Sequence, residues 1–161
     1  MSYEQPAPPA VPASDQTVPL WAPLYGASFG TAIKRFFAKY SDFTGRASRS
    51  EFWWVYLFFV IVNVAISLIG TVFGGAGVTI DASGNIVYAG GFWISTILSL
   101  IWLVATIVPW LAIVWRRLHD GNFAGPLWFL ILIPFVGPII LLVLTLLPSK
   151  PEGARFDRPR A

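Results

Sequence analysis

Three long apolar segments dominate the pattern of hydrophobic and polar positions along this chain. They cover residues 52–74, 92–115 and 127–147, and none of them contains Asp, Glu, Lys, Arg or His. A helix rises about 1.5 Å per residue, so each segment is long enough to cross a bilayer core about 30 Å thick. The pattern therefore predicts an all-α integral membrane protein with three transmembrane helices.

Two of these segments contain residues that affect how a helix packs or continues. Gly70 and Gly74, at the end of the first, form a GxxxG pattern, which permits close approach of helices. The third contains two prolines, and because proline lacks the N–H that a helix interior needs, we expect it to be broken at Pro134–Pro138. Two interpretations stay open: a broken span that still crosses the membrane, which we favour, or two half-helices that turn back.

A shorter amphipathic pattern precedes the first span, over residues 28–40. Apolar side chains recur at the i, i+4, i+7, i+8 and i+11 positions of one helical face: Phe29, Ile33, Phe36, Phe37 and Tyr40. Lys34, Arg35 and Lys39 lie off this stripe. Aromatic side chains on one face and cations on the other predict a helix that lies in the membrane interface. The alternative is a helix packed under the transmembrane bundle.

The same pattern divides the chain into three parts. Residues 1–27 form a proline-rich tail that we expect to be disordered, residues 28–157 form the membrane domain, and residues 158–161 form a short polar tail. Residues 18–25 are more apolar than a disordered tail, so two alternatives stay open for them: they lie on the membrane surface, or they form a loop packed on the helix that follows. Within the membrane domain, residues 75–91 carry no Lys or Arg and predict a short β-hairpin around a glycine-containing turn.

Composition fits a membrane protein. The 161 residues are 56% hydrophobic and 12% charged, whereas soluble domains carry about 25% charged residues. A net charge of +3 is also compatible with nucleic-acid binding. The basic residues cluster beside the apolar segments, however, as positive-inside anchoring requires, so we expect no nucleic-acid partner.

The distribution of basic residues predicts the topology. Five Lys and Arg residues precede the first span, Arg116 and Arg117 follow the second, and residues 75–91 have none. The positive-inside rule then places the N-terminus and the Arg116–Asp120 loop in the cytoplasm and the hairpin outside. Three crossings would put the basic C-terminal tail outside, against this rule, whereas a re-entrant last segment would keep it inside.

Four motifs resemble those of a known family. The sequence contains, in order, Phe43-Thr44-Gly45-Arg46-Ala47-Ser48-Arg49-Ser50-Glu51-Phe52-Trp53, Arg116-Arg117-Leu118-His119-Asp120, Leu132-Ile133-Pro134-Phe135-Val136-Gly137 and Gly153-Ala154-Arg155-Phe156-Asp157. They resemble the F-x-G-R-x-x-R-x-E-[FY]-W, R-R-L-H-D, L-I-P-x-x-G and G-x-N-R-F-G motifs of domain-of-unknown-function family 805. In the last motif, Ala154 and Asp157 replace the family's Asn and final Gly. The resemblance implies a multi-pass protein of the bacterial plasma (inner) membrane. It implies no mechanism, because the family's biochemical function is not established.

Four residues are expected to cap or end helices. Ser48 and Glu51 have the spacing of a capping box at the start of the first transmembrane helix. The helix dipole favours the Glu51 carboxylate in this first turn. Gly121 is expected to cap the end of the second span, and Asp120 to cap or pair locally.

Five basic residues are expected to meet at the cytoplasmic interface: Arg46, Arg49, Arg116, Arg117 and His119. Arginine matches phosphate geometry, and basic clusters between transmembrane helices bind lipid headgroups. We therefore predict that this set binds an anionic headgroup or a phosphate group, although ordinary positive-inside anchoring gives much of the same pattern. The expected partners are membrane lipids, especially anionic ones, and a second copy of this chain or another membrane protein.

The sequence offers little to catalysis. It contains no cysteine and one histidine, so we expect no metal site, no cofactor and no catalytic residue. The favoured function is a non-catalytic membrane protein whose basic cytoplasmic face engages anionic headgroups or a protein partner. One alternative is a small transporter or channel subunit that acts as an oligomer, which the broken third span favours. The second is a membrane enzyme acting on a phosphate-containing lipid at the Arg116–Asp120 loop.

Overall fold

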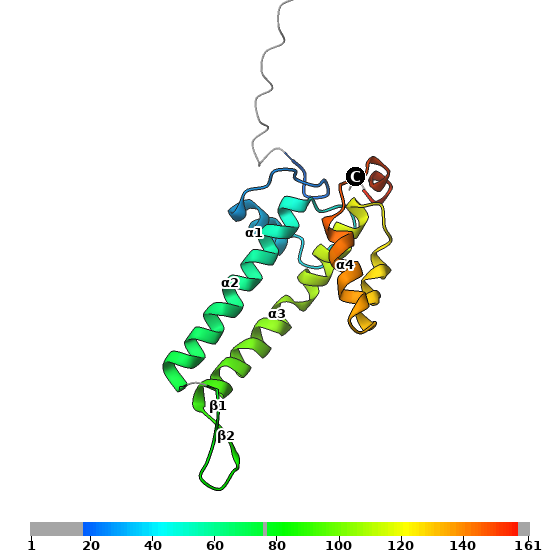
Figure 1. The fold of residues 1–161 in the computed structure, drawn as a ribbon. Coiled ribbons are helices and arrows are strands. Elements are labelled where there is room, and N and C mark those ends of the chain that lie inside the picture. The colour runs from blue at the N-terminus through cyan, green and yellow to red at the C-terminus, as the bar shows by residue number, and fades with distance from the viewer. Residues whose placement is uncertain (1–17, 76, 158–161) are drawn as a thin grey trace, which may run out of the picture.

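Two long antiparallel helices form the frame of the molecule in the computed structural model, which describes residues 18–75 and 77–157. The elements in chain order are α1 (Phe29–Ala38), α2 (Arg49–Gly74), β1 (Val78–Ile80), β2 (Ile86–Tyr88), α3 (Gly90–Asp120), η1 (Gly125–Leu132), α4 (Val136–Leu146) and η2 (Pro151–Phe156). The β-hairpin lies at one end of the α2–α3 pair (Figure 1). At the other end lie α1, the start of α2, the end of α3 and the C-terminal segment, and we call it the α1 end.

The first two apolar segments form the helices that the sequence predicts. α2 and α3 have 26 and 31 residues, and both are long and apolar enough to cross a membrane. Their large apolar side chains are mostly exposed, and Val72 and Val104 are each 73% exposed. Lipid is a better solvent than water for such a surface. The expected β-hairpin is also present, with Val78 paired to Tyr88 and Ile80 to Ile86.

α2 and α3 approach closely where small residues meet. A Cβ added at Gly70 would lie 1.7 Å from Ser95 Oγ, and one added at Gly74 would lie 2.0 Å from the backbone nitrogen of Gly91. A side chain at either position would push the helices apart. The GxxxG pair therefore packs α2 against α3 within one chain.

The third apolar segment does not form one long helix as expected, because residues 125–146 form a helical hairpin. Phe135 has a left-handed backbone (φ 61°), and the chain reverses there between η1 and α4. A Cβ on Gly137 would lie 1.8 Å from the carbonyl oxygen of Leu130, so the two arms touch just past the turn. α4 has 11 residues, a length of about 16 Å, which is too short for a bilayer core. Figure 1 shows both arms beside the last part of α3.

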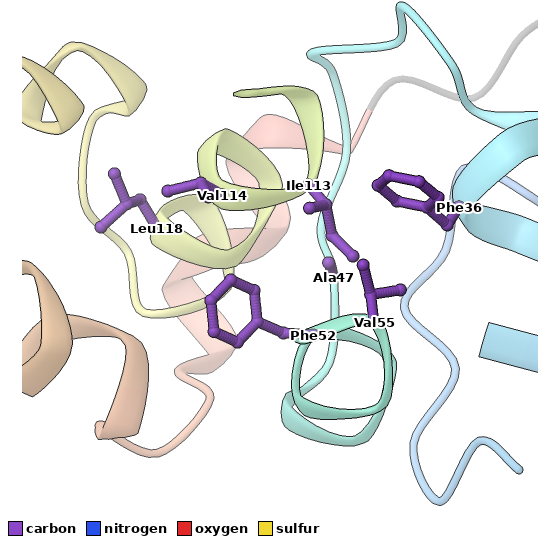
Figure 2. Close-up of a cluster of buried hydrophobic side chains, with 7 residues drawn as sticks. All are labelled: Phe36, Ala47, Phe52, Val55, Ile113, Val114 and Leu118. Carbon is purple, nitrogen blue, oxygen red and sulfur yellow. The ribbon is translucent and has the colours of Figure 1, made fainter. Parts of the chain in front are cut away.

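A small apolar core holds α1, α2 and α3 together at the α1 end. Its buried members are Phe36, Ala47, Phe52, Val55, Ile113, Val114 and Leu118. In Figure 2, Phe36 of α1 faces Val55 of α2 and Ile113 of α3, and Phe52 lies between α2 and α3. Burial of these side chains fixes the ends of both long helices against α1.

The apolar segment before α1 is packed against the helices, which matches the alternative of a loop packed on the helix that follows. Leu24 and Ala27 are buried, although both fall in the expected disordered tail of residues 1–27. The Leu24 N–H donates to Glu51 Oε2 (3.1 Å), and Trp54 Nε1 donates to the Ala27 carbonyl (2.8 Å). Residues 24–27 therefore pack against the start of α2. The expectations for residues 1–17 and 158–161 lie outside the described residues.

Helix α1 forms close to the expected range, but its buried face is not the expected one. Ser28 caps it, and Ala32, Arg35 and Phe36 are buried, followed by Lys39. The prediction that Arg35 and Lys39 lie off the packed face is therefore wrong. In the structure, α1 turns both cations toward α2 and α3. This arrangement matches the alternative of a helix packed under the two long helices.

Candidate functional site

The first and last motifs of the sequence join at the α1 end. The Arg46 guanidinium contacts the Asp157 carboxylate, with Nη2 2.6 Å from Oδ2, and this hydrogen bond raises the pKa of Arg46. The Gly45 N–H donates to the Phe156 carbonyl at 2.9 Å. His119 Nδ1 lies 3.1 Å from the Gly45 carbonyl oxygen. The segment that follows α4 is therefore tied to the segment that precedes α2.

His119 serves as a packing surface for this segment. Its ring stacks on the Phe156 ring at a centroid distance of 4.0 Å and an angle of 4°. A Cβ on Gly153 would lie 2.5 Å from the His119 carbonyl oxygen, so η2 needs a glycine there. The histidine is buried between backbone and an aromatic ring, which fits a structural role better than proton transfer.

Asp120 is the centre of a second group of contacts. Its side chain is fully buried and accepts hydrogen bonds from Arg117, Ser149 and, at 3.1 Å, the Tyr25 hydroxyl. Its carbonyl oxygen accepts from the Lys150 N–H at 2.8 Å. Burial first, and the Asp120 carboxylate second, raise the pKa of Tyr25 above 10.0. One carboxylate thus connects residues that precede α1, end α3 and follow α4.

Arg117 holds the end of the helical hairpin. Its side chain is fully buried, its Nε donates to the Thr145 carbonyl at 2.9 Å, and Nη2 donates to the Leu147 carbonyl. These carbonyls belong to the last turn of α4 and the residue after it, where helical partners run out. The arginine therefore supplies the donors that end α4.

Glu51 is the centre of a third group. Ser48 Oγ accepts from the Glu51 N–H, and Glu51 Oε2 accepts from the Ser48 N–H, so the two residues form a capping box. Oε1 also lies 2.6 Å from Arg35 Nε. The Arg35 guanidinium donates further to four carbonyls of the preceding segment: Val18, Pro19, Leu20 and Ala22. Glu51 therefore caps α2 and anchors the approach to α1.

Two further cations are buried beside this group with fewer partners. Arg116 is 1% exposed, and Nη1 donates to the Lys39 carbonyl at 3.3 Å. Its Nε is buried without a hydrogen-bond partner in the described part of the chain. Lys39 is 4% exposed, and burial lowers its pKa to about 8. Placing these charges out of water costs folding free energy.

Stability is expected to rise with pH because of Lys39. The charges around it are Glu51, Arg116, Arg35 and Asp42, but burial has the largest effect on its pKa. The folded pKa of about 8 lies below the ordinary value of 10.5, so the unfolded chain binds the proton more tightly. The unfolding free energy should therefore increase by roughly 3 kcal/mol between about pH 8 and pH 10.5. Unfolding in mild detergent should show this increase in the wild type and in Lys34→Met, and not in Lys39→Met; parallel curves for all three would refute it.

The five residues predicted to bind a headgroup differ in their exposure. Arg116, Arg117 and His119 are buried, and Arg46 is paired with Asp157. Arg49 alone among the five has an exposed side chain. Residues Arg116–Asp120 form the last part of α3, directly before Gly121. Gly121 follows with its N–H bonded to helix carbonyls.

Arg49 lies in the first turn of α2, at the edge of the α1 end. Its Nε donates to the Leu147 carbonyl at 3.0 Å, which joins α2 to the end of α4. Beside it, Trp53, Trp54 and Leu57 line a shallow apolar depression. An exposed guanidinium above aromatic side chains suits the headgroup level of a membrane.

Sequence reasoning missed several members of these groups. Arg35 and Lys39 share a helical face with Ala32 and Phe36, and this i, i+3, i+4, i+7 spacing was the available signal. Tyr25 and Ser149 carry no such signal, because their contacts with Asp120 span 95 and 29 residues of sequence. Among the described residues, no three His, Cys, Asp or Glu side chains come together as a metal site would require.

The sequence of this chain matches the model of a known protein family. The model of a protein family of unknown function, DUF805, matches residues 40–158, which include all four motifs. The chain belongs to the DUF805 family. The contacts at the α1 end therefore join the first, second and last motifs of a DUF805 domain to one another.

Curated DUF805-like relatives come from Escherichia coli strain K12. The inner membrane protein YhaI is 35% identical over 104 residues, which cover 65% of this chain and 73% of YhaI. The inner membrane protein YhaH is 32% identical over 117 residues, which cover 73% of this chain and 85% of YhaH. No solved structure matches the chain.

Proposed function

We propose that this DUF805 protein is a non-catalytic protein of the bacterial inner membrane that binds the headgroup of an anionic lipid at Arg49. In this proposal α2 and α3 cross the bilayer. The helical hairpin enters the membrane from the cytoplasmic side and returns to that side without crossing. The N-terminus and the C-terminal segment both lie in the cytoplasm. Two long apolar helices and relatives named as inner membrane proteins support the membrane part of the proposal.

The contacts of the hairpin support two crossings. η1 begins five residues after α3, and Arg117 near the end of α3 holds the carbonyls of Thr145 and Leu147. Both ends of the hairpin are thus at the end of α3. Two crossings also keep Lys150 and Arg155 on the same side as Arg46, which satisfies the positive-inside rule that three crossings violate.

Thiol labelling of intact cells tests this topology. The chain has no native cysteine, so single-cysteine variants give a clean signal. We expect a membrane-impermeant reagent to label Ser83→Cys in the β-hairpin and to leave Asn122→Cys and Glu152→Cys unlabelled until the cells are opened. Labelling of Glu152→Cys in intact cells would establish a third crossing and overturn the proposed topology.

The exposure of Arg49 carries the headgroup proposal. Arg116 and Arg117 are buried, so neither reaches a lipid phosphate, whereas Arg49 is exposed beside Trp53 and Trp54. Its Nε is used by Leu147, and its terminal nitrogens make no hydrogen bond within the described residues. Terminal guanidinium nitrogens are the donors that match a phosphate group.

Removal of the Arg49 charge is expected to release anionic lipid. A charge-assisted hydrogen bond contributes about 1.5–3 kcal/mol, so Arg49→Gln should retain about tenfold less phosphatidylglycerol than the wild type. Native mass spectrometry of the protein in mild detergent, with phosphatidylcholine as the uncharged reference, measures this. Lys34→Gln removes an exposed charge from α1 and should behave like the wild type. Equal losses of phosphatidylglycerol in both variants would show that the lipid responds only to the overall positive charge, and would contradict a site at Arg49.

A further inference from the structure

A groove opens between the long helices and the helical hairpin. Because the chain turns back at Phe135, the hairpin lies beside α3. A space of about 400 Å³ remains between the hairpin, α2 and α3. Small-molecule pockets have volumes of about 300–1,000 Å³. We call this space the aromatic groove.

The walls of the aromatic groove are apolar and come from three elements. α2 contributes Trp53 and Tyr56, α3 contributes Trp110, and the hairpin contributes Trp128, Leu141 and Leu142. Tyr56 is 45% exposed and Leu142 is 51% exposed, so the groove is open to the surroundings. No charged side chain lines it. Such walls bind a hydrocarbon chain by van der Waals packing.

One end of the groove lies close to the only exposed arginine of the predicted set. Arg49 precedes Trp53 by about one turn of α2, and its Nε binds the Leu147 carbonyl just after the hairpin residues that line the groove. The arginine therefore bridges the same two elements, α2 and the hairpin, that the groove separates. A ligand that fits both parts has a negative headgroup and a hydrocarbon chain.

We propose that the aromatic groove holds one acyl chain of the anionic phospholipid whose headgroup lies at Arg49. The inference rests on the proposed function and names the second contact of the same ligand. The hairpin then serves as a clamp that holds the chain against α2, and the site selects a lipid by charge at one end and by shape along the groove.

Filling the groove tests the proposal on the full-length protein. Leu142→Trp adds bulk at an exposed groove position, and Leu68→Trp adds the same bulk at an exposed position of α2 that does not line the groove. We expect Leu142→Trp to lower the retention of phosphatidylglycerol about fivefold and Leu68→Trp to leave it unchanged, as measured by native mass spectrometry. Equal retention in both variants overturns the groove as the acyl site.

A second measurement leaves Leu142 unchanged and follows tryptophan fluorescence. Phosphatidylglycerol with brominated acyl chains, added at one equivalent, should quench tryptophan fluorescence. Trp128→Phe in the groove should remove more of this quenching than Trp93→Phe, which replaces an exposed tryptophan outside the groove. Equal losses overturn the proposal.

The experiments test the headgroup site at Arg49 and the aromatic groove independently. If Arg49→Gln loses the lipid and Leu142→Trp keeps it, the headgroup site stands and the groove proposal is overturned. If Leu142→Trp loses the lipid and Arg49→Gln keeps it, the groove is supported as an acyl site and the headgroup site fails. If Leu142→Trp instead changes the oligomeric state with lipid retention unaltered, a second copy of the chain occupies the groove and the proposal is overturned.

Discussion

The Asp120→Asn variant is expected to lose about 3–5 kcal/mol of unfolding free energy, the usual cost of breaking a buried ion pair from one side. Asparagine keeps the size of the side chain and removes its charge. The fully buried Arg117 guanidinium would then have no carboxylate, and an amide nitrogen would replace one of the two oxygens that accept from Ser149 and Tyr25. The helical hairpin should loosen first, because Arg117 holds its end.

Unfolding in mild detergent by added SDS, followed by tryptophan fluorescence, measures this loss. Asp81→Asn removes an exposed carboxylate from the β-hairpin turn and should leave the midpoint nearly unchanged. The pair Arg117→Met and Asp120→Asn should be strongly non-additive, since the double variant has no unpaired buried charge. Asp120→Asn unfolding at the wild-type midpoint would contradict the structural role of this pair.

Glu51→Gln is expected to have a similarly large effect, again about 3–5 kcal/mol, because it leaves Arg35 buried without its carboxylate. Glutamine still accepts hydrogen bonds from the Ser48 and Leu24 N–H groups, so the capping box is weakened rather than abolished. The main consequence should be release of the segment before α1, whose four carbonyls depend on Arg35.

Limited proteolysis separates this local release from global unfolding. Glu51→Gln should be cleaved faster within residues 18–27, and its unfolding midpoint should fall. Glu152→Gln, which removes an exposed carboxylate of η2, should match the wild type in both measurements. Unchanged cleavage of Glu51→Gln would show that Arg35 does not need this partner.

The long helices were predictable from sequence because each feature is local. The absence of charge over residues 52–74 and 92–115 depends on consecutive positions, as does the three-residue spacing of Ser48 and Glu51. The Gly70–Gly74 pattern predicted close packing, but the identity of the partner, Gly91 of the same chain, required the antiparallel arrangement.

The reversal of the last apolar segment was only partly predictable. Pro134 and Pro138 predicted a break, and a break alone does not distinguish a kink from a turn. The left-handed backbone of Phe135 and the contact of Gly137 with the Leu130 carbonyl decide between them. Phenylalanine gives no sequence signal for such a backbone.

The contacts of the basic residues could not be predicted from the sequence. Charge alone predicted that Arg46, Arg116 and Arg117 would face lipid, because arginines near a span end usually do. Their partners are carbonyls and carboxylates from distant segments, such as Asp157, which lies 111 residues from Arg46. Only the folded chain shows that these cations are already bound.

The pairing of Gly45 and Arg46 with Phe156 and Asp157 also sets an order of events during synthesis. The ribosome makes η2 after both long helices, so α2 and α3 are available for insertion before the α1 end has all its parts. Insertion and completion of the fold are therefore separate steps. A chain interrupted before Pro151 would lack the Phe156 ring that stacks on His119 and the Asp157 carboxylate that pairs with Arg46.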